Sequence, residues 1–126
     1  MTRLALVPSP PEGWEDVCAV DDVLVGTGVC ALVAGRQIAI VRTESAVYAL
    51  GNFDPFSKAY VLSRGIVGDR GGVPKIASPI YKQSFDLRTG QCLDDPQVRL
   101  PSYEVRVERG RIFVSCEPRP GGTDGA

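Results

Sequence analysis

The sequence predicts an all-β fold, a sandwich or barrel of short antiparallel strands. No part of the chain shows the long apolar period of a helix, and turn-forming residues recur throughout, with 14 Gly and 10 Pro among 126 residues. The clearest hairpin begins at Tyr103, where apolar and charged residues alternate as far as Glu108. It continues through the turn Arg109-Gly110 into a second strand at 111–116.

A second hairpin is predicted nearer the N-terminus. Residues 29–34 form its first strand, Gly35-Arg36 its turn and residues 37–42 its second strand. Because the first strand is apolar on both faces, we expect it to be buried between layers. A third strand, rich in β-forming residues, follows at 46–50.

Residues 52–79 are expected to form long loops, because Gly and Pro recur through them with only short apolar patches between. Loops held by a rigid sheet are where function is usually found. The ends of the chain carry their own signals. Proline-rich residues 1–13 predict a flexible arm, residues 14–116 one domain, and residues 117–126, rich in Pro and Gly, a disordered tail.

Composition excludes several classes of function. With 44% hydrophobic and 23% charged residues the chain is an ordinary globular sequence, and its net charge of −1 argues against nucleic-acid binding. No segment reaches the roughly 20 apolar residues that a membrane span needs. The N-terminus has no signal-peptide pattern, so we expect a cytoplasmic protein.

Cysteine and histidine usage narrows the possible chemistry. Four cysteines are scattered without a Cys-x-x-Cys pair, which favours small buried apolar residues over a tetrathiolate metal site. The chain contains no histidine, so no Ser/His or Cys/His dyad is possible. The sequence therefore gives no sign of catalysis by this chain alone and leaves open whether it is part of an enzyme.

Two loop motifs carry the most specific signal. The first is Asp54-Pro55-Phe56-Ser57, and the second runs from Ser78-Pro79-Ile80-Tyr81 to Phe85-Asp86-Leu87-Arg88-Thr89-Gly90. Together they resemble a Rieske [2Fe–2S] domain, whose loops read Cys-Pro-His and Cys-Pro-x-His-x-x-x-Phe-Asp-x-x-Thr-Gly. The resemblance implies a Rieske-like β-sandwich in which the four ligand positions are degenerate, namely Asp54, Phe56, Ser78 and Tyr81.

A narrower resemblance rests on the same loops together with the segment Leu62 to Asp69. The chain is similar to the small subunit of assimilatory NAD(P)H-dependent nitrite reductase. That family implies a cluster-free Rieske-like subunit beside a large subunit, which carries FAD, an iron–sulfur cluster and sirohaem and reduces nitrite to ammonium.

The degenerate positions predict no cofactor in this chain. Carboxylate, hydroxyl and phenol oxygens are hard ligands, whereas a Rieske cluster takes thiolate and imidazole. Two other functions stay open. One is a Rieske-type electron carrier that holds a cluster through unexpected ligands, and the other is a cluster-free module that serves another oxidoreductase.

The aromatic and basic residues of the loops suggest two roles. Phe56 and Tyr81 are predicted to pack together and fill the space of the missing cluster, although each could pack on the core independently. The loops also predict a docking face for the large subunit, unless their charges form an ordinary solvated surface. Its expected members are Phe56, Lys58, Tyr60, Arg64, Tyr81 and Lys82.

Overall fold

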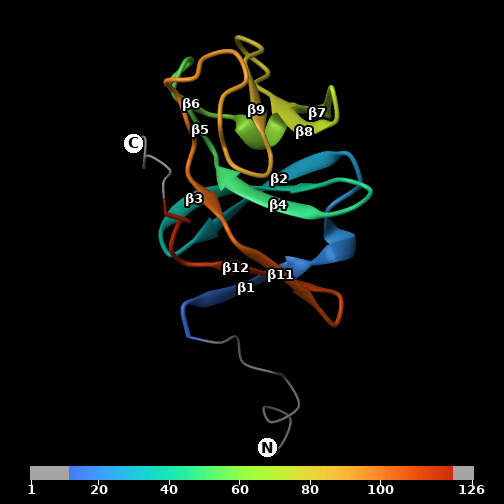
Figure 1. The fold of residues 1–126 in the computed structure, drawn as a ribbon. Helices are drawn as coiled ribbons and strands as arrows, with labels where there is room; N and C mark the ends of the chain where they lie inside the picture. Colours follow the sequence, from blue (N-terminus) through green and yellow to red (C-terminus); the bar gives the residue numbers. More distant parts are fainter. Residues whose placement is uncertain (1–11, 121–126) are drawn as a thin grey trace, which may run out of the picture.

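Three layers of antiparallel strands make up residues 12–120, the part of the chain that this computed structural model describes (Figure 1). The base layer has the strand order β1-β12-β11. Its strands are β1 (Trp14–Ala19), β11 (Val105–Glu108) and β12 (Arg111–Ser115). The middle layer has the order β10-β4-β3-β2. Its strands are β2 (Thr27–Val33), β3 (Arg36–Arg42), β4 (Val47–Gly51) and β10 (Ser102–Tyr103).

The third layer, at the top of Figure 1, consists of two small sheets that we call the cap. One sheet pairs β5 (Phe53–Asp54) with β6 (Ala59–Tyr60). The other has the order β7-β8-β9 and contains β7 (Ile66–Arg70), β8 (Val73–Ala77) and β9 (Ser84–Asp86). Short 3₁₀ turns lie at Val20–Asp22 and Leu62–Arg64. The all-β fold class predicted from the sequence, with its short antiparallel strands, is confirmed.

The two predicted hairpins form, and both close through two-residue turns. Ala34 and Gly35 have φ of 50° and 81°, and Arg109 and Gly110 have φ of 53° and 75°. Positive φ at both central residues is the type I′ geometry that matches the twist of paired strands. The first turn was predicted one residue too late, because Gly35 takes its second position rather than its first.

Alternation along β3 separates the interior into two cores. Ile38 and Ile40 point toward the base layer and belong to one buried cluster. Ala39 and Val41 point toward the cap and belong to a second cluster, which includes Phe85. All four β3 residues are fully buried. A central strand covered on both faces is expected to be apolar throughout.

The prediction that residues 29–34 are buried on both faces was wrong. Strand β2 is the edge of the middle sheet, and Leu32 within it is 66% exposed. The two strands of this hairpin are similarly apolar, so only the order of strands in the sheet decides which one is covered. That order is a property of the whole fold and is not visible in a local pattern.

The prediction of long loops at 52–79 was also wrong. This stretch contains β5, β6, β7 and β8, and Gly71 and Gly72 form the turn that joins β7 to β8. Their φ values are 59° and 91°. Glycine abundance was interpreted as loop composition, whereas here it serves a tight hairpin.

The cysteines and the ends of the chain complete the comparison. Cys92 is buried, as predicted. Cys18 and Cys116 are partly buried against the core cluster that contains Ile38 and Ile40, but Cys30 is exposed on β2. Residues 1–11 of the predicted arm and 121–126 of the predicted tail lie outside the described residues. Within the described part of the tail, the Arg119 N–H donates to the carbonyl of Ser102 at 2.8 Å. No helix among residues 12–120 has the length and apolar character to cross a membrane.

Candidate functional site

The two loops that carry the sequence motif share one construction. The first loop, 54–58, joins β5 to β6, and the second loop, 78–82, lies between β8 and β9. In each, a lysine N–H donates to the carbonyl four residues earlier, at 2.7 Å for Lys58 and 3.1 Å for Lys82. Both lysines have positive φ, 58° and 67°, a conformation that is uncommon outside glycine.

The first side chain of each loop also caps its own turn. Asp54 Oδ1 accepts a hydrogen bond from the N–H of Phe56 at 3.0 Å, and Ser78 Oγ accepts one from the N–H of Ile80 at 3.3 Å. Short polar side chains commonly bond to the backbone two residues ahead in this way. Asp54 and Ser78 therefore hold equivalent places in the two loops.

A buried hydrogen bond joins these two residues. The Ser78 hydroxyl donates to Asp54 Oδ2 at 2.5 Å, and the Ser57 hydroxyl donates to the same oxygen at 2.8 Å. Asp54 and Ser78 are both completely buried. The two positions at which a Rieske domain has its cysteine ligands are therefore in direct contact, and a pair of polar side chains connects the loops.

The other two degenerate positions are not brought together. The ring centroids of Phe56 and Phe85 are 6.2 Å apart, and Phe56 packs against the core cluster on the cap side of β3. Tyr81 is 60% exposed and has no ring partner among the described aromatic residues. The prediction that Phe56 and Tyr81 fill the space together was wrong, and the alternative holds for Phe56. The Asp54–Ser78 hydrogen bond already closes the loops at their bases, and the second loop turns Tyr81 outward.

These residues do not fit a [2Fe–2S] cluster. A Rieske centre takes two thiolates and two imidazoles, whereas the four positions offer a carboxylate, an aliphatic hydroxyl, a phenol and an unreactive phenyl ring. Within residues 12–120 no three or more Asp, Glu, Cys or His side chains are grouped so that they could hold a metal ion.

The predicted docking residues divide into two groups. Lys58, Tyr60, Arg64, Tyr81 and Lys82 are exposed, and we call these five residues the cap surface. Phe56 is partly buried in the core and is not part of that surface. Two further exposed apolar side chains of the cap were missed by sequence reasoning, Ile66 at 59% and Ile80 at 46% exposure.

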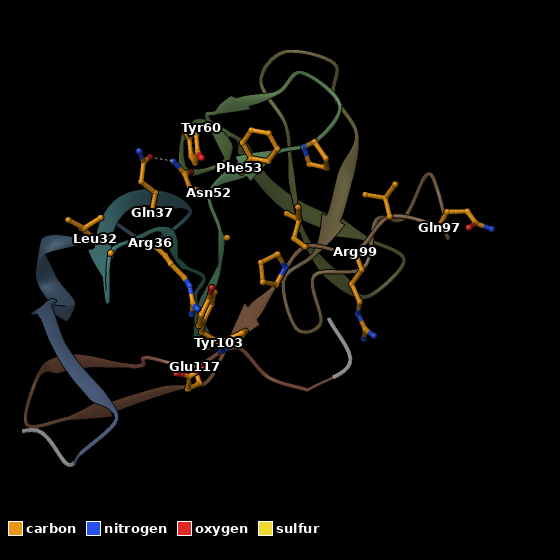
Figure 2. A pocket seen from close by; sticks show the side chains of 17 residues that line it. Leu32, Arg36, Gln37, Asn52, Phe53, Tyr60, Gln97, Arg99, Tyr103 and Glu117 are labelled. Carbon is orange, nitrogen blue, oxygen red and sulfur yellow. Dashed lines mark hydrogen bonds between the residues drawn. The ribbon is translucent and has the colours of Figure 1, made fainter. Parts of the chain in front are cut away.

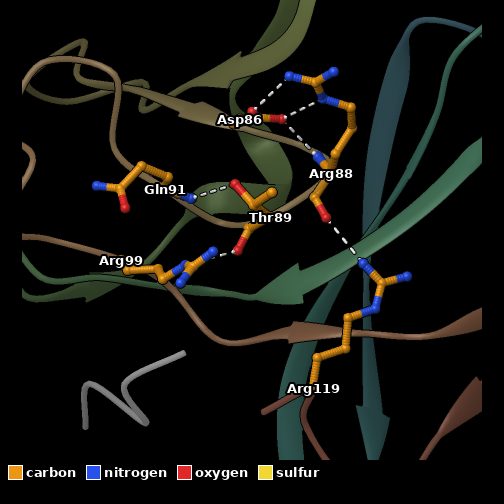
Figure 3. Close-up of polar contacts among 6 residues, drawn as sticks. All are labelled: Asp86, Arg88, Thr89, Gln91, Arg99 and Arg119. Carbon is orange, nitrogen blue, oxygen red and sulfur yellow. Dashed lines mark hydrogen bonds and ion pairs between the residues drawn. The ribbon is translucent and has the colours of Figure 1, made fainter. Parts of the chain in front are cut away.

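Motif residues 86–90 form a turn after β9 that arginine side chains hold in place (Figure 3). Asp86 accepts two side-chain hydrogen bonds from Arg88, at 3.1 Å and 3.0 Å. Burial acts to raise the pKa of the Asp86 carboxyl, but the hydrogen bonds and charge of Arg88 outweigh burial and hold the pKa below its usual value. Arg119 and Arg99 donate to the carbonyls of Arg88 and Thr89, at 2.9 Å and 3.4 Å. Hydrogen bonds from three arginines thus fix this turn.

Asn52 is a site residue that sequence reasoning missed. It is only 1% exposed, and its Oδ1 accepts a hydrogen bond from the N–H of Ser63 at 2.7 Å. Its amide nitrogen donates to Gln37 Oε1 at 3.2 Å, the dashed contact in Figure 2. Asn52 therefore ties β3, the start of the first loop and the 3₁₀ turn together. A polar residue between two short strands gives no signal of this role in the sequence.

A groove of about 710 Å³ opens beside the first loop (Figure 2). Phe53 and Tyr60, whose ring centroids are 5.0 Å apart, line one end. Arg36, Arg99 and Glu117 line other parts of it. Its walls come from segments distant in the chain, so no local pattern could reveal it.

The comparisons with known proteins agree with this geometry. A family model described as a Rieske-like [2Fe-2S] domain matches residues 13–115. The nitrite reductase (NADH) small subunit of Salmonella typhimurium is 46% identical over 101 residues, which cover 79% of this chain and 94% of that protein. A crystal structure of an NADH-dependent nitrite reductase small subunit from Mycobacterium tuberculosis has a TM-score of 0.79 and 51% identity, covering 81% of this chain and 93% of that one.

A third relative differs in its organisation. The nitrite reductase [NAD(P)H] large subunit of Klebsiella oxytoca is 42% identical over 108 residues, which are 86% of this chain but 11% of that protein. A domain similar to this one is therefore part of a much longer polypeptide there. On the full set of matches, this chain belongs to the Rieske-like [2Fe-2S] domain family and, within it, to the small subunits of NAD(P)H-dependent nitrite reductase.

Proposed function

We propose that this chain is a cluster-free accessory subunit in cytoplasmic nitrite assimilation. It binds a large subunit that carries FAD, an iron–sulfur cluster and sirohaem, the cofactors that the family resemblance implies, and that reduces nitrite to ammonium with NAD(P)H. The observation that carries the proposal is the buried Asp54–Ser78 hydrogen bond, because it occupies the loop positions where a redox-active member of the fold needs thiolates. The chain acts by association rather than by electron transfer.

The Klebsiella relative supports association with a large subunit. Where a similar domain is part of the large-subunit polypeptide, the chain itself keeps the domain at a high effective concentration beside the rest of the enzyme. A separate subunit needs an interface to reach the same arrangement. We infer that the present chain supplies that interface from its own surface.

The cap surface is the interface that we propose. Its two tyrosines are 55% and 60% exposed, and large exposed aromatic side chains commonly anchor protein–protein interfaces. Its three basic residues, Lys58, Arg64 and Lys82, would steer it toward an acidic patch of the large subunit. The Asp54–Ser78 hydrogen bond fixes the two loops. Three of the five residues belong to these loops, and Tyr60 lies next to the first loop.

Iron and sulfide content tests this proposal. The full chain, purified alone and without oxygen, should hold no stoichiometric iron or acid-labile sulfide. Mixed with its cognate large subunit, it should co-elute with that subunit. About two irons per chain would make it an electron carrier and overturn the cluster-free assignment. Co-purification with a different oxidoreductase in place of the large subunit would show that the fold is correct and the partner wrong.

Substitutions on the cap surface should weaken the complex without unfolding the domain. Tyr81→Ala removes an exposed anchor, and we expect a loss of about 2 kcal/mol of binding free energy, or roughly thirtyfold in Kd. Lys82→Glu should slow association, most strongly at low salt. Calorimetry and stopped-flow binding with the cognate large subunit measure both effects.

Arg109→Glu is the matched control for Lys82→Glu. Arg109 is also basic, exposed and at positive φ, but it lies in the β11–β12 turn of the base layer. Thermal unfolding of each variant verifies its fold. If Tyr81→Ala and Lys82→Glu both bind like this control, the cap surface is not the interface.

A further inference from the structure

The groove beside the first loop has an apolar end that solvent reaches. Tyr60, 55% exposed, stands at its rim, and its ring packs against that of Phe53 (Figure 2). Leu32 also lines the groove and is 66% exposed, although it is a large aliphatic residue. It lies on β2, the edge strand of the middle layer. Among the eight large exposed apolar residues of the described chain, two therefore border this one groove.

The groove also has a net positive lining. Arg36 and Arg99 are its basic residues and Glu117 is its acidic residue among the described residues that line it. The guanidinium of Arg36 is held in place, because one of its nitrogens donates to the carbonyl of Cys116 at 3.2 Å. A guanidinium carries five N–H donors, so an arginine fixed through one contact still has donors for a carboxylate.

The size of the groove favours a segment of chain over a whole domain. At about 710 Å³ it lies within the range of roughly 300–1,000 Å³ in which compact ligands bind, enough for a few side chains. It is also continuous with the cap surface, because Tyr60 belongs to both. A partner that docks on the cap would therefore have the mouth of the groove within its own footprint.

We propose that this groove binds an extended segment of the large subunit that carries an apolar or aromatic side chain and, nearby, a carboxylate. The apolar side chain contacts Leu32 and Tyr60, and the carboxylate pairs with Arg36. This inference rests on the function proposed above and deepens it, since it adds a second contact and states the chemistry of the partner segment.

Binding of the cognate large subunit by groove variants tests the inference. Leu32→Glu places a charge among the apolar residues of the lining, and Arg36→Glu reverses one of its positive charges. We expect each to raise Kd about tenfold or more, whereas Arg36→Lys should retain part of the affinity because it keeps the charge but not the fork of donors. The Leu32 side chain is 66% exposed, so Leu32→Glu should leave the domain folded, which thermal unfolding verifies.

Val107→Glu is the matched control. Val107 is 47% exposed and lies on β11, the edge strand of the base layer, so the same charge is introduced at an equivalent kind of position away from the groove. This variant should bind the large subunit with wild-type affinity. If Leu32→Glu and Arg36→Glu bind as tightly as Val107→Glu, the groove inference is overturned.

The outcomes separate this inference from the proposed function. If the wild-type chain binds the large subunit, and Lys82→Glu weakens this binding while the groove variants leave it unchanged, the groove inference is overturned. The assignment as a subunit then stays intact. A wild-type chain that does not bind the large subunit at all would overturn both.

Overlapping synthetic peptides of the large subunit provide the second measurement. The peptide that binds should contain an acidic and an apolar residue and should lose affinity for the Arg36→Glu variant, and peptides that bind both proteins equally would contradict the inference.

Discussion

Replacement of Asp54 by alanine should lower the free energy of unfolding by about 3 kcal/mol, a large share of the roughly 5–15 kcal/mol of a typical domain. Three donors lose their acceptor in this variant, namely the N–H of Phe56 and the hydroxyls of Ser57 and Ser78. Ser78 is completely buried, so its hydroxyl cannot turn to water instead. The cost is that of polar groups left unpaired in the interior.

Urea unfolding measures this loss, and two comparisons make it specific. Asp69→Ala removes an exposed carboxylate that accepts one hydrogen bond, from the N–H of Gly72, and should change stability by about 0.5 kcal/mol or less. A double-mutant cycle with Ser78→Ala isolates the pair and should give a coupling of about 1 kcal/mol or more. A loss below about 1 kcal/mol for Asp54→Ala, or no coupling, would show that this hydrogen bond does not hold the loops together.

Gly90→Ala should be the more damaging substitution and is expected to cost more than about 4 kcal/mol or to prevent folding. Gly90 has φ of +85°, which favours glycine, and an added Cβ would lie 2.1 Å from the carbonyl oxygen of Leu100. That oxygen belongs to the backbone and cannot rotate away. Leu100 is also held by its own N–H, which donates to the Gly90 carbonyl at 2.8 Å.

Gly110→Ala separates the two causes of this effect. Gly110 has φ of +75°, but an added Cβ there would meet nothing within 4 Å. The Gly110→Ala variant should therefore lose only about 1–2 kcal/mol of unfolding free energy, the cost of placing alanine at positive φ. Soluble yield and urea unfolding of the two variants give the comparison. Equal losses for both would mean that the close approach of the Leu100 backbone contributes nothing.

The parts of the fold that local patterns determine could be predicted. The 103–116 and 29–42 hairpins were found because turn residues and strand alternation lie close together in the sequence. Burial was predicted for the first strand of the 29–42 hairpin, whereas the second strand, β3, is the covered one, because only the order of strands in the complete sheet distinguishes them. Strands β5 and β6 of the cap were missed because each is only two residues long, too short for alternation to be seen.

The candidate site divides in the same way. The four degenerate positions followed from the resemblance of the two loops to the Rieske motifs, and within the second motif Phe85 is fully buried and Gly90 has positive φ. The Asp54–Ser78 hydrogen bond could not be foreseen, since its partners are 24 residues apart and meet only when two small sheets pack together.

Nitrite-dependent oxidation of NAD(P)H by the cognate large subunit, with and without the full chain, tests the central claim most directly. An accessory subunit that works by association should raise the rate on addition and reach saturation at the stoichiometry of the co-eluting complex. The increase should need no iron from this chain. A large subunit that is fully active alone and does not associate with this chain would contradict the account.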